Sequence, residues 1–284
     1  MRRITLEELS RFESLDHFFR KGPAGNGRHP RLSAPQAVAA THKYAHAYQV
    51  VNNLGGHNFL NVWAPPIAAN QIFSLSQHWY AGGSGAKLQT VEVGWQVYPQ
   101  KYGNSKPALF IYWTADGYSH TGCYNLDCHA FVQTNPNWTF GGALGPVSST
   151  GGTQYELEVA FYLYKGNWWL YLKGTRASQA VGYYPASIFG GGQLASNALD
   201  IDYGGETVGT TSWPPMGSSA LASAGWQRAA FQRDIYFYPT GGGAQAAQLT
   251  ASQPSPKCYT IALFSAAPPW NKYFFFGGPG GTQC

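Results

Sequence analysis

Two glutamates of this sequence stand in a local pattern that suits acid–base chemistry. Glu92 in "TVEVGW" has a glycine two residues later, and Glu206 in "DIDYGGE" has one two residues earlier. Residues two apart on a strand share a face, so each glycine would leave open space beside a carboxylate. Two carboxylates that face one groove can hold a single proton between them, which supplies an acid and a base for activating water. We predict Glu92 and Glu206 as this pair; the alternative is that each faces solvent or pairs with an arginine.

The other carboxylates outside the N-terminal region fit this chemistry less well. Glu156 and Glu158 share a strand face, but both lie on one strand without an adjacent glycine, so we expect exposed edge residues. Asp116 in "TADGY" and Asp127 between two cysteines have the surroundings of turn residues.

Serine and metal chemistry find little support in the sequence. The segment "GGSGA" is not followed by a helix, as a nucleophile elbow would be. Histidines 42, 46, 57 and 78 fall in strand-like segments, and we interpret them as polar strand positions rather than metal ligands. We therefore expect neither a metal nor a cofactor.

The composition predicts an all-β protein. Charged residues make up 11% of the 284 residues, aromatic residues reach 16%, and there are 35 glycines. Soluble domains usually carry roughly 25% charged residues. Strand patterns recur along the chain, among them "KYAHAYQVV", "NFLNVWAP", "TVEVGWQVYP", "ALFIYWTADGY" and "LDIDYGGETVG". "YKGNWWLYL" predicts a hairpin around Gly166 and Asn167. An antiparallel two-sheet β-sandwich would bury these one-sided strands.

The N-terminal region predicts the one clear helix. Residues 5–20 carry a capping box, Thr5 with Glu8, and an apolar stripe at helical spacing. A Gly/Pro-rich linker follows. We divide the chain into residues 1–36, a helix and linker that could serve as a prosegment, and a β-sandwich domain over residues 37–284.

Charge and cysteine content limit the partners and the compartment that we expect for the protein. The formal net charge of +5 is spread without Lys/Arg clusters, and no apolar run is long enough for a membrane helix. We expect no nucleic acid, no membrane and a monomer. Four cysteines allow three pairings, of which the local ones cost least in loop closure. Two disulfides would indicate an oxidising compartment, although the N-terminus has no signal-peptide core.

Longer motifs resemble the neprosin family of glutamic peptidases. These are "TVEVGWQVYPQKYG", "LFIYWTADGYSHTGCYNLDCHAFVQTN", "GYYPASIF", "IDYGGETV" and "YFFFGGPG", in the expected order, and the similarity runs from about residue 40 to the end of the sequence. The resemblance implies a secreted β-sandwich endopeptidase that is active in acid and cuts on the C-terminal side of proline. It implies two catalytic glutamates, which map by motif onto Glu92 and Glu206.

The resemblance also implies the disulfides Cys123–Cys128 and Cys258–Cys284. For the proline pocket we expect aromatic walls, because a pyrrolidine ring is apolar and has no backbone N–H to recognise. The candidates from the motif strands are Trp95, Trp113, Tyr118 and Tyr203, the last replacing the tryptophan usual in the family. Strand alternation places Trp95 on the face opposite Glu92, where it would be a core residue.

Two other functions remain open from the residues alone. The many Trp and Tyr side chains could form a carbohydrate-binding surface without any chemistry. A β-sandwich glycoside hydrolase would also use two carboxylates, separated by a fixed distance across a glycosidic bond.

Overall fold

The structure is a computed structural model, and it describes residues 5, 7, 10, 11 and 40–284. The predicted helix over residues 5–20, the linker and the boundary at residue 36 lie outside the described residues, apart from those four positions. The described part is almost entirely antiparallel strand, which confirms the predicted all-β class.

Fourteen strands follow one another along the chain. They are β1 (Thr41–Asn61), β2 (Gln71–Gly82), β3 (Gln89–Val97), β4 (Ala108–Thr114), β5 (Val132–Gln133), β6 (Glu156–Tyr164), β7 (Asn167–Leu172), β8 (Ala180–Pro185), β9 (Ala198–Gly209), β10 (Ala230–Pro239), β11 (Gln245–Ala246), β12 (Thr250–Ser252), β13 (Thr260–Ser265) and β14 (Lys272–Gly277). The described helices are short: α3 (Pro99–Tyr102) and the 3₁₀ turns Gly85–Lys87, Ala177–Gln179, Ala186–Phe189, Gln193–Ala195 and Ala222–Ala224. None is long or apolar enough to span a membrane.

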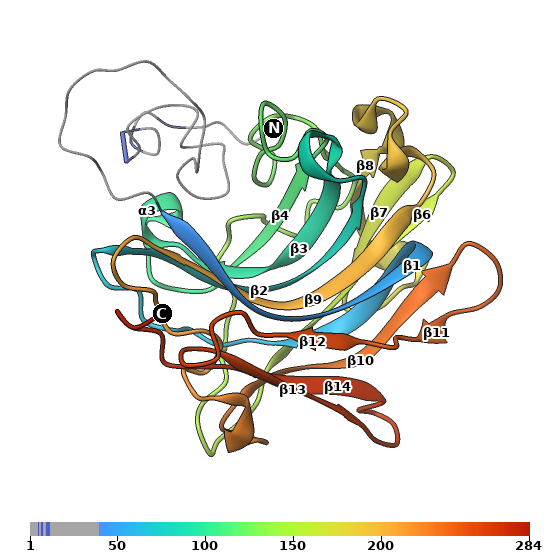
Figure 1. The fold of residues 1–284 in the computed structure, drawn as a ribbon. Helices are drawn as coiled ribbons and strands as arrows, with labels where there is room; N and C mark the ends of the chain where they lie inside the picture. The colour runs from blue at the N-terminus through green and yellow to red at the C-terminus, as the bar shows by residue number, and fades with distance from the viewer. Residues whose placement is uncertain (1–4, 6, 8–9, 12–39) are drawn as a thin grey trace.

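The strands form two packed layers joined through β1. The main path of the sheet runs β4-β3-β2-β9-β1-β6-β7-β8-β5, and β10 pairs with β1 and with β14. In Figure 1 the strands β4, β3, β2, β9 and the first half of β1 form a curved layer above β10, β12, β13 and β14. This arrangement matches the predicted sandwich.

The length of β1 differs from the prediction. We expected separate strands at "KYAHAYQVV" and "NFLNVWAP", whereas one strand of 21 residues includes all of the first segment and the first half of the second. Its first half pairs with β9 and its second half with β6 and β10, across a register shift between Val50 and Asn53. Gly55 lies in this bend with φ 112°, and a Cβ there would collide with the carbonyl of Phe161. Glycine at this position lets β1 approach β6 closely and continue from one layer into the other.

The predicted hairpin is confirmed, with its turn shifted by one residue. Tyr164 and Asn167 form the last pair of β6 and β7, so the turn residues are Lys165 and Gly166. Both have positive φ, of 49° and 73°, as a two-residue hairpin turn requires.

Alternation along β3 determines which side chains fill the core. Val91, Val93, Trp95 and Val97 all belong to the main core. Their neighbours in sequence, including Glu92, point to the concave face. The structure forms the disulfides Cys123–Cys128 and Cys258–Cys284, as the resemblance implied.

Candidate active site

Glu92 and Glu206 lie on the concave face of the curved layer, on β3 and β9, with β2 between them. Trp79 of β2 pairs in register with Glu92, and Leu75 pairs with Glu206. Side chains directly opposite in neighbouring strands share a face, so both glutamates face the same side. They are 0% and 1% exposed. Both line one cavity of about 300 Å³, formed by Tyr44, His46, Gln77, Trp79, Leu88, Glu92, Tyr118, Asp202 and Glu206.

The glycines beside the glutamates do not create this space, which corrects our sequence interpretation. A Cβ at Gly94 would collide with the carbonyl of Ser76, and one at Gly204 with the carbonyl of Ala45. Gln77 of β2 stands opposite both glycines. The glycines therefore permit close approach of the neighbouring strands, and the cavity comes from the curvature of the layer and the walls around it.

Two hydroxyl groups hold Glu92. The Tyr118 hydroxyl donates to its Oε1 at 2.7 Å, and the Thr90 hydroxyl donates to the same oxygen at 2.9 Å. Burial first, and then the charge of Glu92, raise the pKa of Tyr118 well above its ordinary value. Tyr118 consequently remains a neutral donor over the whole acid range.

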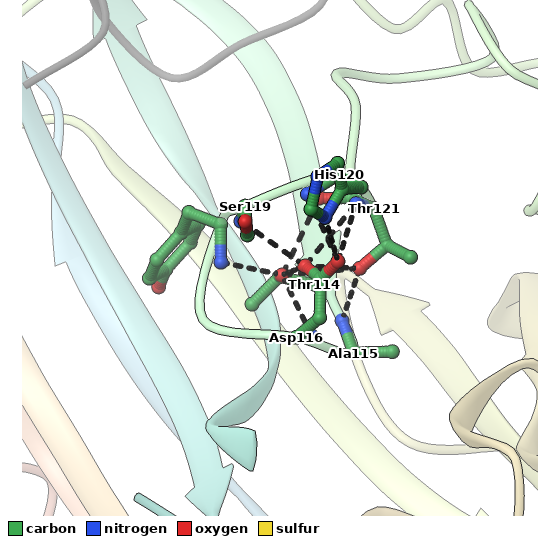
Figure 2. Close-up of polar contacts among 7 residues, drawn as sticks. Thr114, Ala115, Asp116, Ser119, His120 and Thr121 are labelled. Carbon is green, nitrogen blue, oxygen red and sulfur yellow. Dashed lines mark hydrogen bonds and ion pairs between the residues drawn. The ribbon is translucent and has the colours of Figure 1, made fainter. Parts of the chain in front are cut away.

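A tightly bonded loop presents Tyr118 to the cavity. Figure 2 shows its centre, Asp116, whose carboxylate accepts the backbone N–H groups of residues 119–121 and the Thr121 hydroxyl, at 2.8–3.1 Å. Partial burial alone would raise the pKa of Asp116, but the Thr121 hydroxyl and these amides outweigh it and lower the pKa. The Thr114 hydroxyl accepts the N–H of Tyr118, which has φ 63°. Asp116 is thus the turn residue we expected, and its turn positions a site residue.

Glu206 contacts two side chains of β1. Its Oε1 lies 2.5 Å from His42 Nδ1 and accepts the Tyr44 hydroxyl at 3.4 Å. Burial first, and then the charges of Glu206 and Glu92, raise the pKa of Tyr44 well above its ordinary value. Tyr44 therefore experiences the electrostatic field of both glutamates. Our sequence analysis interpreted His42 as a polar strand position and missed this contact.

A second histidine–carboxylate pair occupies the same cavity. His46 Nδ1 lies 2.8 Å from both carboxylate oxygens of Asp202, and the ring stacks on Trp79 at 5.8 Å. Burial raises the pKa of Asp202 to about 7 even though His46 opposes the shift. Burial alone would lower the pKa of His46, but the hydrogen bond and charge of Asp202 raise it.

Of the four aromatic candidates, the structure brings only Tyr118 to the cavity. Trp95 and Tyr203 are fully buried in the main core, on the opposite face of their strands from the glutamates. Trp113 also faces that core, where it contacts Phe189. Trp95 thus lies on the core face, as strand alternation indicated, and the same parity takes Trp113 and Tyr203 away from the cavity, which corrects their expected place in a pocket wall. Trp79, which the sequence analysis missed, lines the cavity instead.

A buried amide supports the strands beneath the cavity. Gln232 of β10 donates through Nε2 to the Ser76 hydroxyl at 2.9 Å, to the carbonyl of Gln77 at 3.1 Å and to the carbonyl of Gly204 at 3.3 Å. Its Oε1 accepts the amide of Asn58 at 2.6 Å. The second layer thereby ties β2 to β9 at the row that separates the two glutamates.

The carboxylates on β6 lie elsewhere. Glu156 forms an ion pair with Arg233, and Glu158 lies 2.9 Å from His57 Nε2. Both are on the outside of the sandwich and partly exposed. Among the described residues, no group of three or more His, Cys, Asp or Glu side chains could hold a metal ion.

Comparison with known proteins gives a family and several structural neighbours. The family model described as Neprosin matches residues 70–279, a range that contains Glu92 and Glu206. Two structures of scytalido-glutamic peptidase, with a peptide-based transition-state analogue and with a transition-state analogue inhibitor, match 85% of this chain and 100% of theirs, at 8% identity and TM-scores of 0.43 and 0.44. SCP-B, a member of the Eqolisin family in complex with the tripeptide Ala-Ile-His, matches with the same coverage at 7% identity and a TM-score of 0.43.

Proposed function

The chain belongs to the neprosin family of glutamic peptidases, and on that basis we propose that it cleaves peptides on the C-terminal side of proline in acid, with Glu92 and Glu206 as its catalytic pair. The observation that carries the proposal is the placement of both glutamates, buried, on one cavity of the concave face. A cavity of about 300 Å³ has room for a short peptide segment and a water.

Two carboxylates in one cavity provide the chemistry of peptide hydrolysis. Because like charges disfavour each other, the pair retains one proton in acid, and the ionised member can take a proton from water while the protonated member gives one to the leaving amine. Tyr118 and Tyr44 offer neutral hydroxyl donors beside the pair, which suits stabilisation of an oxyanion.

The walls of the cavity support recognition of proline. Trp79 and Tyr118 present aromatic surfaces, and Leu88 adds an aliphatic one. A pyrrolidine ring is compact and apolar, so packing on such surfaces is the available means of selecting it. We propose Trp79 and Tyr118 as the walls of the proline pocket.

The disulfides and the family suggest where the protein acts. Both cysteine pairs are oxidised in the structure, and disulfides persist in extracellular compartments. We propose a secreted monomer that acts on proline-containing peptides or proteins.

Paired internally quenched peptides test the proposal. The two peptides differ only in Pro or Ala at one position, and both are incubated with the protein at about pH 4.5, with products identified by mass spectrometry. We expect cleavage after proline, and none with Glu92→Gln. A panel of polysaccharides is assayed in parallel. Hydrolysis of a polysaccharide, or no peptide cleavage at any acid pH, would overturn the proposal.

A further inference from the structure

The two glutamates are held by groups of different chemistry. Glu92 receives two hydroxyls, from Thr90 and Tyr118. A hydroxyl can donate to a carboxylate and can accept from a carboxylic acid, so these partners tolerate both states of Glu92. Glu206 instead receives the ring nitrogen of His42 at 2.5 Å. An imidazolium can only donate, and its charge favours an ionised partner.

The ring of His42 is fixed in orientation yet open to solvent. It lies nearly parallel to the ring of Tyr44, at 6.4 Å, and meets the ring of Phe73 edge-on, at 6.2 Å. Phe73 is fully buried, whereas the His42 side chain is 31% exposed. The ring can therefore exchange protons with solvent while keeping Nδ1 directed at Glu206.

From this asymmetry, and resting on the proposed function, we propose that His42 is a positioning residue that keeps Glu206 ionised, so that Glu206 is the base and Glu92 is the acid. The hydrogen bond from His42 Nδ1 favours the carboxylate form of Glu206, which assigns the shared proton of the pair to Glu92. His42 itself does not contact the reacting atoms in this account.

Among the described residues, titratable neighbours of Glu206 come from β1, β3 and β9. From β1 they are His42 and Tyr44, and from β3 comes Glu92, whose charge acts on Tyr44 together with that of Glu206. From β9 comes Asp202, already paired with His46. β2 contributes Phe73 to the surroundings of His42. Among the residues that the structure describes, His42 is the basic group with a hydrogen bond to Glu206, and the charge of Glu206 also acts on His46.

Hydrolysis then begins with Glu206 as the carboxylate and Glu92 as the carboxylic acid. The Glu206 carboxylate takes one proton from water as the water oxygen bonds to the carbonyl carbon, which gives a tetrahedral oxyanion. The carboxylic acid of Glu92 gives its proton to the amide nitrogen, and the C–N bond breaks as the C=O bond re-forms. The products are a carboxylic acid and an amine, and transfer of a proton from Glu206 to Glu92 restores the pair.

Replacement of His42 by Asn separates charge from hydrogen bonding, because the Asn amide keeps a neutral donor near the position of Nδ1. Without the imidazolium, Glu206 is protonated at a higher pH, and the base is lost earlier on acidification. The acid limb of the kcat/KM profile should therefore move to higher pH by about one unit or more, with the alkaline limb little changed.

His57→Asn is the matched control, since His57 also contacts a glutamate of a neighbouring strand, Glu158, but outside the cavity. We expect that control to leave both limbs in place.

Movement of the alkaline limb alone would assign the acid to Glu206 and overturn the inference. An equal loss of activity at every pH, with both limbs in place, would show that His42 is merely structural and would also overturn it. Thermal unfolding of each variant checks that it folds.

A second readout does not depend on activity. Titration of the Glu206 side-chain carbon by ¹³C NMR, assigned with Glu206→Gln, should show its midpoint rising by about one unit or more in His42→Asn. An unchanged midpoint would overturn the inference. If the wild-type protein cleaves no peptide, the proposed function fails, and this titration still decides whether His42 keeps Glu206 ionised.

Discussion

Glutamates gather at two places in this sandwich, and the two places differ in what surrounds them. On β6, Glu156 and Glu158 are partly exposed and pair with Arg233 and His57 on the outside. On the concave face, Glu92 and Glu206 are buried in one cavity. The partners of Glu156 and Glu158 on β6 only balance charge. Partly exposed ion pairs of this kind contribute little to stability.

The comparison shows that burial and partner type, more than position on a strand, distinguish a reactive carboxylate from an ordinary one. A carboxylate paired with arginine stays ionised and is occupied by its partner. Glu92, with hydroxyl partners, can gain and lose a proton without losing its hydrogen bonds. The glutamates of the cavity can therefore transfer protons, whereas Glu156 and Glu158 on the outside do not.

The largest expected effect separates the two places directly. Glu92→Gln or Glu206→Gln should lower kcat by roughly a hundred- to ten-thousandfold, because each removes a group that transfers a proton. Glu158→Gln, an identical change outside the cavity, should leave kcat within about twofold. Steady-state kinetics on a proline peptide checks this. Similar losses in all three variants would erase the distinction between the two places.

The next largest effect is expected from removal of the Tyr118 hydroxyl, which donates to Glu92. Tyr118→Phe removes a donor to a buried carboxylate, worth about 1.5–3 kcal/mol, so kcat/KM should fall roughly ten- to a hundredfold. Tyr164→Phe is the control, since Tyr164 is 50% exposed on the outer end of β6. An unchanged kcat/KM in Tyr118→Phe would show that the hydroxyl does not matter to the cavity.

A smaller effect concerns selectivity. Trp79→Leu removes an aromatic wall, so the ratio of kcat/KM for Pro and Ala peptides should fall about tenfold, the size of an aromatic packing contribution. Trp169→Leu, on a strand outside the cavity, should keep the ratio. The same ratio in Trp79→Leu and the wild-type protein would exclude Trp79 as the selector.

The smallest effect is on stability. The pKa of Asp202 is about 7 in the folded protein, against about 3.9 when unfolded, so folding favours its protonated form. Its contribution to stability is present at low pH and is lost as pH rises from about 4 to 7. The raised pKa of His46 acts in the same direction, since its stabilisation is lost as pH rises through the folded value.

The protein should therefore melt a few degrees higher at pH 5 than at pH 8, and Asp202→Asn should reduce that difference. Differential scanning fluorimetry measures it, with Glu158→Gln as the control outside the cavity. A difference that persists in Asp202→Asn would place its origin elsewhere.

Much of this arrangement could be predicted from local pattern. Alternation alone puts the side chain of Glu92 on the opposite face of its strand from Val91 and Val93. The β-rich composition indicates the class of fold. What local pattern could not supply is the order of strands. His42 reaches Glu206 and Trp79 reaches the cavity because β1 and β2 flank β9, and nothing in their own segments indicates it.

The errors have physical reasons of the same kind. Tyr203 stands in a motif strand three residues from Glu206, and an odd separation along a strand puts a side chain on the other face. Gly94 and Gly204 suggested open space, but neighbouring backbone fills it. A glycine in a strand can mark a close approach of backbone as readily as a groove.

The central claim is that Glu92 and Glu206 act as one unit on one water, and a double-mutant cycle tests it most directly. The kcat/KM of Glu92→Gln, Glu206→Gln and the double variant would be measured on the same proline peptide at about pH 4.5. Residues that act together are grossly non-additive, so the double variant should be within a few-fold of either single variant. Losses that multiply, or a single variant that keeps full activity, would contradict the account.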